Sequence, residues 1–195
     1  LHIIFCQARY ASQYSENVDR DFLELPSQMN EHWAFEPDLL KEYAHHYKTG
    51  EPIPDDIIEK LQFLPHHNAG CNNIINIANS YLDMKYGMIP SKDIDKIDIL
   101  KFEEEIRNEL RMPHEIDYKY KGPYFRHTFE CDDYSCGVYT YKWAEILDTV
   151  AFELFKEKGV FDKETALSFR KNILEMGASE DPMKLFVKFR GCEPK

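Results

Sequence analysis

Residues 20–33 read Arg20-Asp21-Phe22-Leu23-Glu24-Leu25-Pro26-Ser27-Gln28-Met29-Asn30-Glu31-His32-Trp33, and this stretch carries the clearest local signals of the chain. Pro26 stands where a helix begins, because a proline in the first turn gives up no backbone hydrogen bond. Pro37 follows, and a proline breaks a helix or opens the next one. The stretch therefore predicts a helix over 27–35, with Asp21 and Glu24 just before it.

Helical periodicity dominates the rest of the chain, and no internal repeat is present. Residues 116–129 instead alternate, are rich in tyrosine and contain Gly122-Pro123, which favours an extended or irregular segment. The pattern predicts the all-α class, with a short β ribbon allowed, in a single helical lobe over 1–195. Further helices are expected at 2–14, 37–49, 54–64, 68–86, 99–110, 134–158, 162–176 and 182–189.

The composition argues against several classes of protein. Lys and Arg number 24 against 35 Asp and Glu, which gives the 195 residues a net charge of −11. Such an acidic chain is poorly suited to nucleic acid or an anionic membrane as partner, and no apolar run is long enough to span a bilayer. Five cysteines without a Cys-x-x-Cys pair favour neither a disulfide framework nor a thiolate zinc site, so we expect a reducing, cytoplasmic location.

Two partial metal motifs carry little weight. His114-Glu115-Ile116-Asp117-Tyr118 begins like His-Glu-x-x-His, but a tyrosine replaces the second histidine that a zinc helix needs. Glu42-Tyr43-Ala44-His45 matches one half of a di-iron site, which requires two such motifs. We therefore interpret the first as a solvated loop and expect no di-iron site from the second.

Two clusters of polar residues remain. Asp21 and Glu24 precede a helix start, and His127 stands among tyrosines in the second half of the chain. Carboxylate, imidazole and phenol are groups that hydrolases use, as an oxygen ligand for a metal and as neutral donors for a developing oxyanion. The alternative is that the tyrosines line a helical core and bond to the backbone. These tyrosines are Tyr118, Tyr120, Tyr124, Tyr134, Tyr139 and Tyr141.

Residues 20–33 resemble the segment that follows the zinc helix in the thimet-oligopeptidase family of zinc metallopeptidases, and most of all its bacterial peptidyl-dipeptidase and oligopeptidase A branch. Further blocks agree in order and spacing over nearly the whole chain, in 1–11, 125–129, 134–145 and 169–194. The resemblance implies the C-terminal helical lobe of a zincin-type catalytic domain. It also implies hydrolysis of short peptides, by release of C-terminal dipeptides or by internal cleavage.

The resemblance also implies a metal site. Members of this family hold one Zn²⁺ with two histidines of a His-Glu-x-x-His helix and a glutamate on the next helix. Glu24 matches that glutamate, and Asp21 matches an acidic position that supports a zinc-bound histidine. The His-Glu-x-x-His motif, with the general base, is expected immediately before Leu1 and so outside this sequence.

His127, Tyr134 and Tyr141 match positions that the family places around the substrate. The resemblance implies that they donate hydrogen bonds to the substrate backbone or to the tetrahedral oxyanion. This chain departs from the family pattern nearby: Glu130-Cys131-Asp132-Asp133 replaces a glycine run with one residue inserted, and Val138 replaces a tyrosine.

These observations lead to one expectation about the chain and one alternative. We expect part of a zinc metallopeptidase whose partners are short peptides and the remainder of the same polypeptide, with neither nucleic acid nor membrane. Because it holds one of three zinc ligands and no general base, the chain alone is expected to be inactive and to bind zinc weakly. The alternative is a non-catalytic helical lobe that binds peptides or a partner protein.

Overall fold

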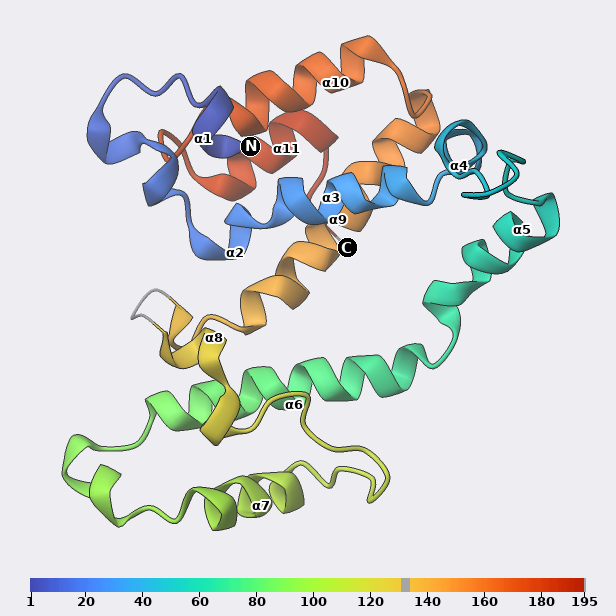
Figure 1. Ribbon diagram of the computed structural model, residues 1–195. Coiled ribbons are helices and arrows are strands. Elements are labelled where there is room, and N and C mark those ends of the chain that lie inside the picture. Colours follow the sequence, from blue (N-terminus) through green and yellow to red (C-terminus); the bar gives the residue numbers. More distant parts are fainter. Residues whose placement is uncertain (131–133, 195) are drawn as a thin grey trace. The chain divides into compact units, whose positions relative to one another are not determined.

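The computed structural model describes residues 1–130 and 134–194 (Figure 1). Within these ranges every regular element is a helix, and the β pairing is confined to an isolated antiparallel bridge between His45 and Pro52. The all-α class predicted from the sequence is therefore confirmed. The short β ribbon that the pattern allowed is not formed by the described residues.

Backbone contacts divide the chain into two compact units. Unit 1 comprises residues 1–64 and 143–195, and unit 2 comprises residues 65–142. Helix α9 (Tyr139–Lys158) starts in unit 2, and the rest of it belongs to unit 1. That the chain forms a single lobe stays a prediction.

Unit 1 is built from short helices joined by tight turns. Pro26 and Pro37 stand in the first turns of two of them and Pro182 in that of a third, as expected for prolines at helix starts. In Figure 1, α10 and α11 lie side by side, next to the short α1. The elements are α1 (His2–Phe5), η1 (Ala11–Gln13), η2 (Ser15–Asn17), α2 (Arg20–Leu23), α3 (Leu25–Ala34), α4 (Pro37–Tyr43), α5 (Asp55–Phe63), α10 (Lys163–Phe169), the π-helical η7 (Arg170–Leu174) and α11 (Pro182–Arg190).

The helix expected over 2–14 is wrong, because α1 ends at Phe5. The following backbone pairs with a distant turn instead of continuing the helix. The N–H of Gln7 donates to the carbonyl oxygen of Glu175 at 2.8 Å, and the N–H of Ala178 donates to that of Gln13 at 2.8 Å. These bonds link residues more than 160 positions apart, so local periodicity contains no sign of them.

Helix α4 also ends earlier than expected, at Tyr43 rather than Thr49. The chain folds back on itself there, with the N–H of Ile53 donating to the carbonyl oxygen of Ala44 at 2.8 Å. This return is the isolated bridge described above. In contrast, α5, α10 and α11 begin within about one residue of their predicted positions.

The core of unit 1 joins α3, α9, α10, η7 and α11. Leu25, Ile173 and Phe186 are fully buried in it, and each such side chain contributes about 1.5–3 kcal/mol by leaving water. Aromatic rings pack against one another in this core, and Phe169 and Phe189 make a T-shaped contact with 5.1 Å between centroids. Burial of Leu25 fixes the first turn of α3. The other buried members are Val18, Phe22, Met29, Leu147, Ala151, Phe152, Phe155, Leu174, Leu185 and Phe189.

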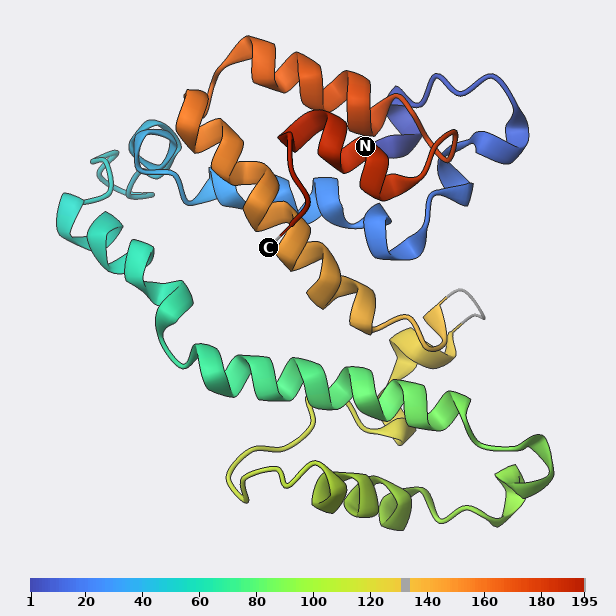
Figure 2. The same ribbon diagram turned by 180° about the vertical axis from the view of Figure 1, so that it is seen from behind.

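Unit 2 is built on two helices, α6 (Ala69–Gly87) and α7 (Ile99–Glu109), which run side by side (Figure 2). Their buried contacts involve Ala78, Leu82, Ile106 and Tyr118. The shorter elements are η4 (Ser91–Lys96), η5 (Gly122–Tyr124) and α8 (Arg126–Phe129). None of the helices that the structure describes is long and apolar enough to cross a membrane.

Buried polar side chains of α6 and α7 hold the irregular segment that follows them. Asn79 accepts the N–H of Lys119 at 2.8 Å and donates to the carbonyl oxygen of Tyr120 at 2.7 Å. Glu103 of α7 accepts the N–H of Gly122 and the hydroxyl of Tyr86. Since buried backbone groups need partners, these side chains replace the ladder bonds that an irregular segment lacks. The extended or irregular segment expected over 116–129 is thereby confirmed for 116–121, whereas η5 and α8 form within the rest of it.

Candidate functional site

Glu24 lies at the junction of α2 and α3, where it ends one helix and precedes the other. Leu25, the next residue, is fully buried, so the position of the Glu24 backbone is fixed by the core of unit 1. The Ser27 hydroxyl oxygen lies 2.6 Å from the Glu24 carboxylate and 2.9 Å from the Glu24 carbonyl oxygen, so both acceptors share its one proton. The half-buried carboxylate is therefore held in one orientation at a helix N-terminus, where negative charge is favoured.

Asp21 lies one turn before Glu24, on α2. Burial, and then the nearby Asp19 carboxylate, raise the pKa of Asp21, while a backbone hydrogen bond acts in the opposite direction. Burial and like charge both disfavour the ionised form. An N–H donor placed near Asp21 would offset that cost, as a ligating histidine does when it bonds a carboxylate.

A complete metal site is not formed within residues 1–130 and 134–194. No group of three or more histidine, cysteine, aspartate or glutamate side chains there could hold a metal ion. Glu24 is thus a single well-oriented carboxylate. Its role as a zinc ligand stays a prediction.

His127, Tyr134 and Tyr141 come together in unit 2. The Nε2 atom of His127, on α8, lies 2.7 Å from the hydroxyl oxygen of Tyr141, in the first turn of α9. The His127 ring also packs on the ring of Tyr134, with 4.2 Å between centroids and 38° between planes. Imidazole N–H and phenol O–H groups can both donate to an oxygen that gains negative charge, and in the bond between His127 and Tyr141 one of the two groups donates and the other accepts.

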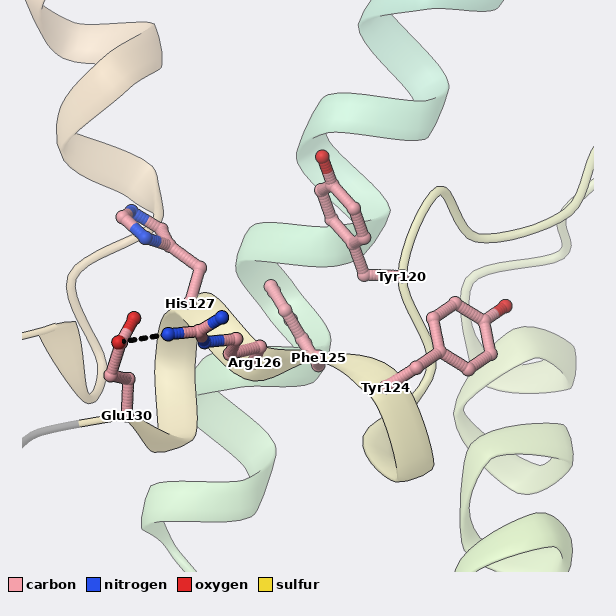
Figure 3. Close-up of a pocket in the computed structure, with 6 residues that line it drawn as sticks. All are labelled: Tyr120, Tyr124, Phe125, Arg126, His127 and Glu130. Carbon is pink, nitrogen blue, oxygen red and sulfur yellow. Dashed lines mark hydrogen bonds and ion pairs between the residues drawn. The ribbon is translucent and has the colours of Figure 1, made fainter.

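A pocket of about 340 Å³ adjoins His127 (Figure 3). Phe125 is buried beneath it and stacks against Tyr120, with 5.3 Å between centroids. On its other side Arg126 donates to Glu130 at 2.6 Å, and the His127 ring projects away from that ion pair. An aromatic pocket bordered by a charged pair can receive an apolar side chain beside polar backbone. The lining residues are Tyr120, Tyr124, Phe125, Arg126, His127 and Glu130.

The tyrosines of this part of the chain differ in burial. Tyr118 is buried, and its hydroxyl bonds the carbonyl oxygen of Glu103, so it is a core residue. Tyr134 and Tyr139 are 37% and 45% exposed. His32, next to Glu31 on α3, bonds Asp148 at 3.0 Å and stacks on Phe152, which are structural contacts.

Sequence reasoning missed Asp83, a buried carboxylate of α6 that bonds the backbone of the turn after Tyr134. The available signal was the spacing of Asn79 and Asp83, one turn apart on a helix whose apolar face carries Leu82. Polar residues one turn apart on a helix can be buried hydrogen-bonding groups and need not belong to a solvent-exposed face. Of the altered loop, Cys131, Asp132 and Asp133 lie outside the described residues.

Comparison with known proteins places the chain among peptidases. It is 33% identical over 196 residues to the dipeptidyl carboxypeptidase of Escherichia coli (strain K12), covering 100% of this chain and 28% of that protein. It is 35% identical over 187 residues to oligopeptidase A of the same organism, covering 91% and 26%. With saccharolysin of Saccharomyces cerevisiae the identity is 30% over 179 residues, covering 91% and 25%. The chain thus spans about a quarter of the length of these relatives.

Residues 1–195 match the sequence profile of Peptidase family M3. The chain belongs to this family, which confirms the resemblance seen in its motifs.

Proposed function

We propose that this chain is part of a zinc-dependent metallopeptidase that hydrolyses short peptides, by releasing C-terminal dipeptides or by internal cleavage. One observation carries the proposal. The 2.7 Å contact between His127 and Tyr141, with Tyr134 packed on the same imidazole, gathers three side chains at positions that family members use around the substrate. Membership of Peptidase family M3 supports the same reaction.

Glu24 fits the proposed metal. Zinc accepts a carboxylate oxygen beside two imidazoles, and Glu24 offers a carboxylate that Ser27 already orients. Two histidines and the general base would come from a His-Glu-x-x-His helix in the polypeptide before Leu1. When bound, zinc lowers the pKa of a water molecule to about 7 and so supplies hydroxide.

His127, Tyr134 and Tyr141 act on the peptide in this proposal. One donor bonds the carbonyl oxygen as it gains charge, and the others align the backbone on either side. A single such donor is worth about 10²–10³ in rate, because it is in place before the charge develops. The pocket beside His127 receives a side chain of the bound peptide.

The proposed partners are short peptides and the remainder of the same polypeptide. An isolated chain with one ligand and no general base would neither hold zinc tightly nor cleave peptides. A cytoplasmic location is part of the proposal, supported by free thiols at Cys6, Cys71, Cys136 and Cys192.

A non-catalytic peptide-binding lobe is the competing function. The altered stretch Glu130-Cys131-Asp132-Asp133 favours it, since these residues stand where family members carry a glycine run. A binding lobe would keep its affinity for peptides when Glu24 is replaced, whereas a peptidase would lose turnover.

The test compares Glu24→Gln with Glu31→Gln in the full polypeptide that carries this chain. Glu31 is an exposed glutamate on α3, so its replacement removes the same charge away from the site. Zinc content is measured by plasma emission spectroscopy, and cleavage of a set of five- to ten-residue peptides is followed by mass spectrometry.

We expect one zinc per chain in the wild type and in Glu31→Gln. Glu24→Gln should lose the metal and at least about 10²-fold in kcat, in proportion to the metal lost. Retention of both zinc and turnover in Glu24→Gln would exclude Glu24 as a ligand. Peptide binding without cleavage in the wild type would establish the binding lobe.

A further inference from the structure

Tyr134 opens a tight turn that leads into α9. The N–H of Gly137 donates to the carbonyl oxygen of Tyr134 at 3.1 Å, which closes the turn. Cys136, inside it, has a φ of 57°, a left-handed conformation that is unfavourable for residues with a side chain. Such a conformation persists only where the surroundings hold it.

Asp83 is what holds this turn. Its side chain is 1% exposed, and its two carboxylate oxygens accept one backbone N–H each: that of Cys136 at 3.1 Å and that of Val138 at 3.0 Å. Hydrogen bonds to a carboxylate are stronger than those between neutral groups, more so when water is excluded. The two bonds span the left-handed residue and come from a helix 53 positions away in sequence.

Gly87 lies four residues after Asp83 on α6, and the side chain of Cys136 packs against it. A Cβ atom at Gly87 would lie 2.1 Å from the Sγ atom of Cys136, far closer than van der Waals contact allows. The Cys136 thiol therefore occupies the space beside the helix that a side chain at Gly87 would fill.

We propose that Asp83 is a positioning residue for Tyr134. Its hydrogen bonds to the N–H groups of Cys136 and Val138 keep the Tyr134 phenol over His127. The Tyr134 ring packs on the imidazole with 4.2 Å between centroids, and Tyr134 is itself 37% exposed. This inference rests on the proposed function, which makes Tyr134 a donor to the substrate. The carboxylate acts through the turn and touches neither peptide nor metal.

The first test is Asp83→Asn in the full polypeptide. The amide keeps the shape but presents N–H₂ to one of the two backbone N–H groups, so one bond is lost. We expect kcat to fall about 10- to 100-fold, as for a displacement near 1 Å, with zinc content unchanged and KM within about threefold.

A double-mutant cycle with Tyr134→Phe separates positioning from general stability. If Asp83 acts through the Tyr134 hydroxyl, Asp83→Asn costs less than about twofold in kcat once that hydroxyl is gone. Equal losses in both backgrounds would show that Asp83 only stabilises the fold and would overturn the inference.

The second test approaches the turn from Gly87. Gly87→Ala should reduce kcat as Asp83→Asn does, because the new methyl group displaces the Cys136 thiol. Adding Cys136→Ala should restore activity, since the remaining Cβ of residue 136 lies 3.9 Å from the new methyl group, at ordinary contact. Gly70→Ala is the matched control, because Gly70 lies on the same helix and nothing lies within 4 Å of a Cβ added there.

An NMR readout distinguishes failure of this inference from failure of the proposed function. The Tyr134 ring shifts the His127 imidazole proton resonances through its ring current, and this shift does not depend on turnover. A wild type without peptidase activity would refute the proposed function, while a changed His127 shift in Asp83→Asn would still support positioning. An unchanged shift together with unchanged kcat would overturn the inference.

Discussion

Replacing Tyr141 by phenylalanine tests the centre of the candidate site. The substitution removes one oxygen atom and keeps the ring, which lies 5.8 Å from the His127 ring between centroids. It breaks the 2.7 Å contact between the hydroxyl and Nε2 of His127. Tyr139→Phe is the matched control, because Tyr139 lies two residues earlier on α9 and is 45% exposed.

Two magnitudes distinguish the roles that Tyr141 could have. As a structural hydrogen bond in a half-buried site, its hydroxyl contributes about 0.5–1.5 kcal/mol to the free energy of unfolding. As a donor to the oxyanion it contributes about 2.7–4 kcal/mol in the transition state, or about 10²–10³ in kcat. The catalytic role therefore predicts a rate loss much larger than the stability loss.

The assay is steady-state cleavage of a fluorogenic peptide by the full polypeptide, with zinc content and urea unfolding measured on the same samples. Tyr141→Phe should lose about 10²-fold or more in kcat with KM nearly unchanged, and Tyr139→Phe should resemble the wild type. A kcat within about threefold of the wild type for Tyr141→Phe would refute the donor role.

Three further predictions concern the chain itself. Gly177 has a φ of 55° and an added Cβ would lie 2.4 Å from the carbonyl oxygen of Gln13, so Gly177→Ala should cost more than about 2 kcal/mol in urea unfolding. Gly191→Ala, strained in φ alone with nothing within 4 Å, should cost about 1 kcal/mol; equal losses would contradict this reasoning. Burial lowers the pKa of His2 to about 4. The unfolded chain therefore binds more protons than the folded chain between pH 6.5 and 4. As the pH is lowered from 6.5 to 4, this difference should reduce the free energy of unfolding by about 3 kcal/mol. His2→Phe should remove this contribution to the pH dependence. Asn79→Ala leaves three backbone groups without this partner, the N–H groups of Lys119 and Tyr120 and the carbonyl oxygen of Tyr120. It should cost about 2 kcal/mol and speed hydrogen exchange at Lys119 and Tyr120; unchanged exchange at these two amides would contradict the prediction.

The helices were largely predictable because their signals are local. Pro26 and Pro182 mark first turns, and Asp162 and Asp181 accept backbone N–H groups as N-caps. The misplaced ends have long-range causes. Helix α1 stops at Phe5 because Gln7 bonds the turn near Glu175, and α9 starts at Tyr139 rather than Tyr134 where Asp83 holds the preceding turn.

By itself, the sequence determined the all-α class, the membership in a peptidase family and the residues to examine, because helix periodicity, prolines and motif order are written along the chain. Only the tertiary structure decided that His127, Tyr134 and Tyr141 form one cluster, and that Asp83 grips the turn between the two tyrosines. The reason is that a buried acceptor and the backbone N–H it satisfies lie up to 55 residues apart, and their pairing leaves no period in the sequence.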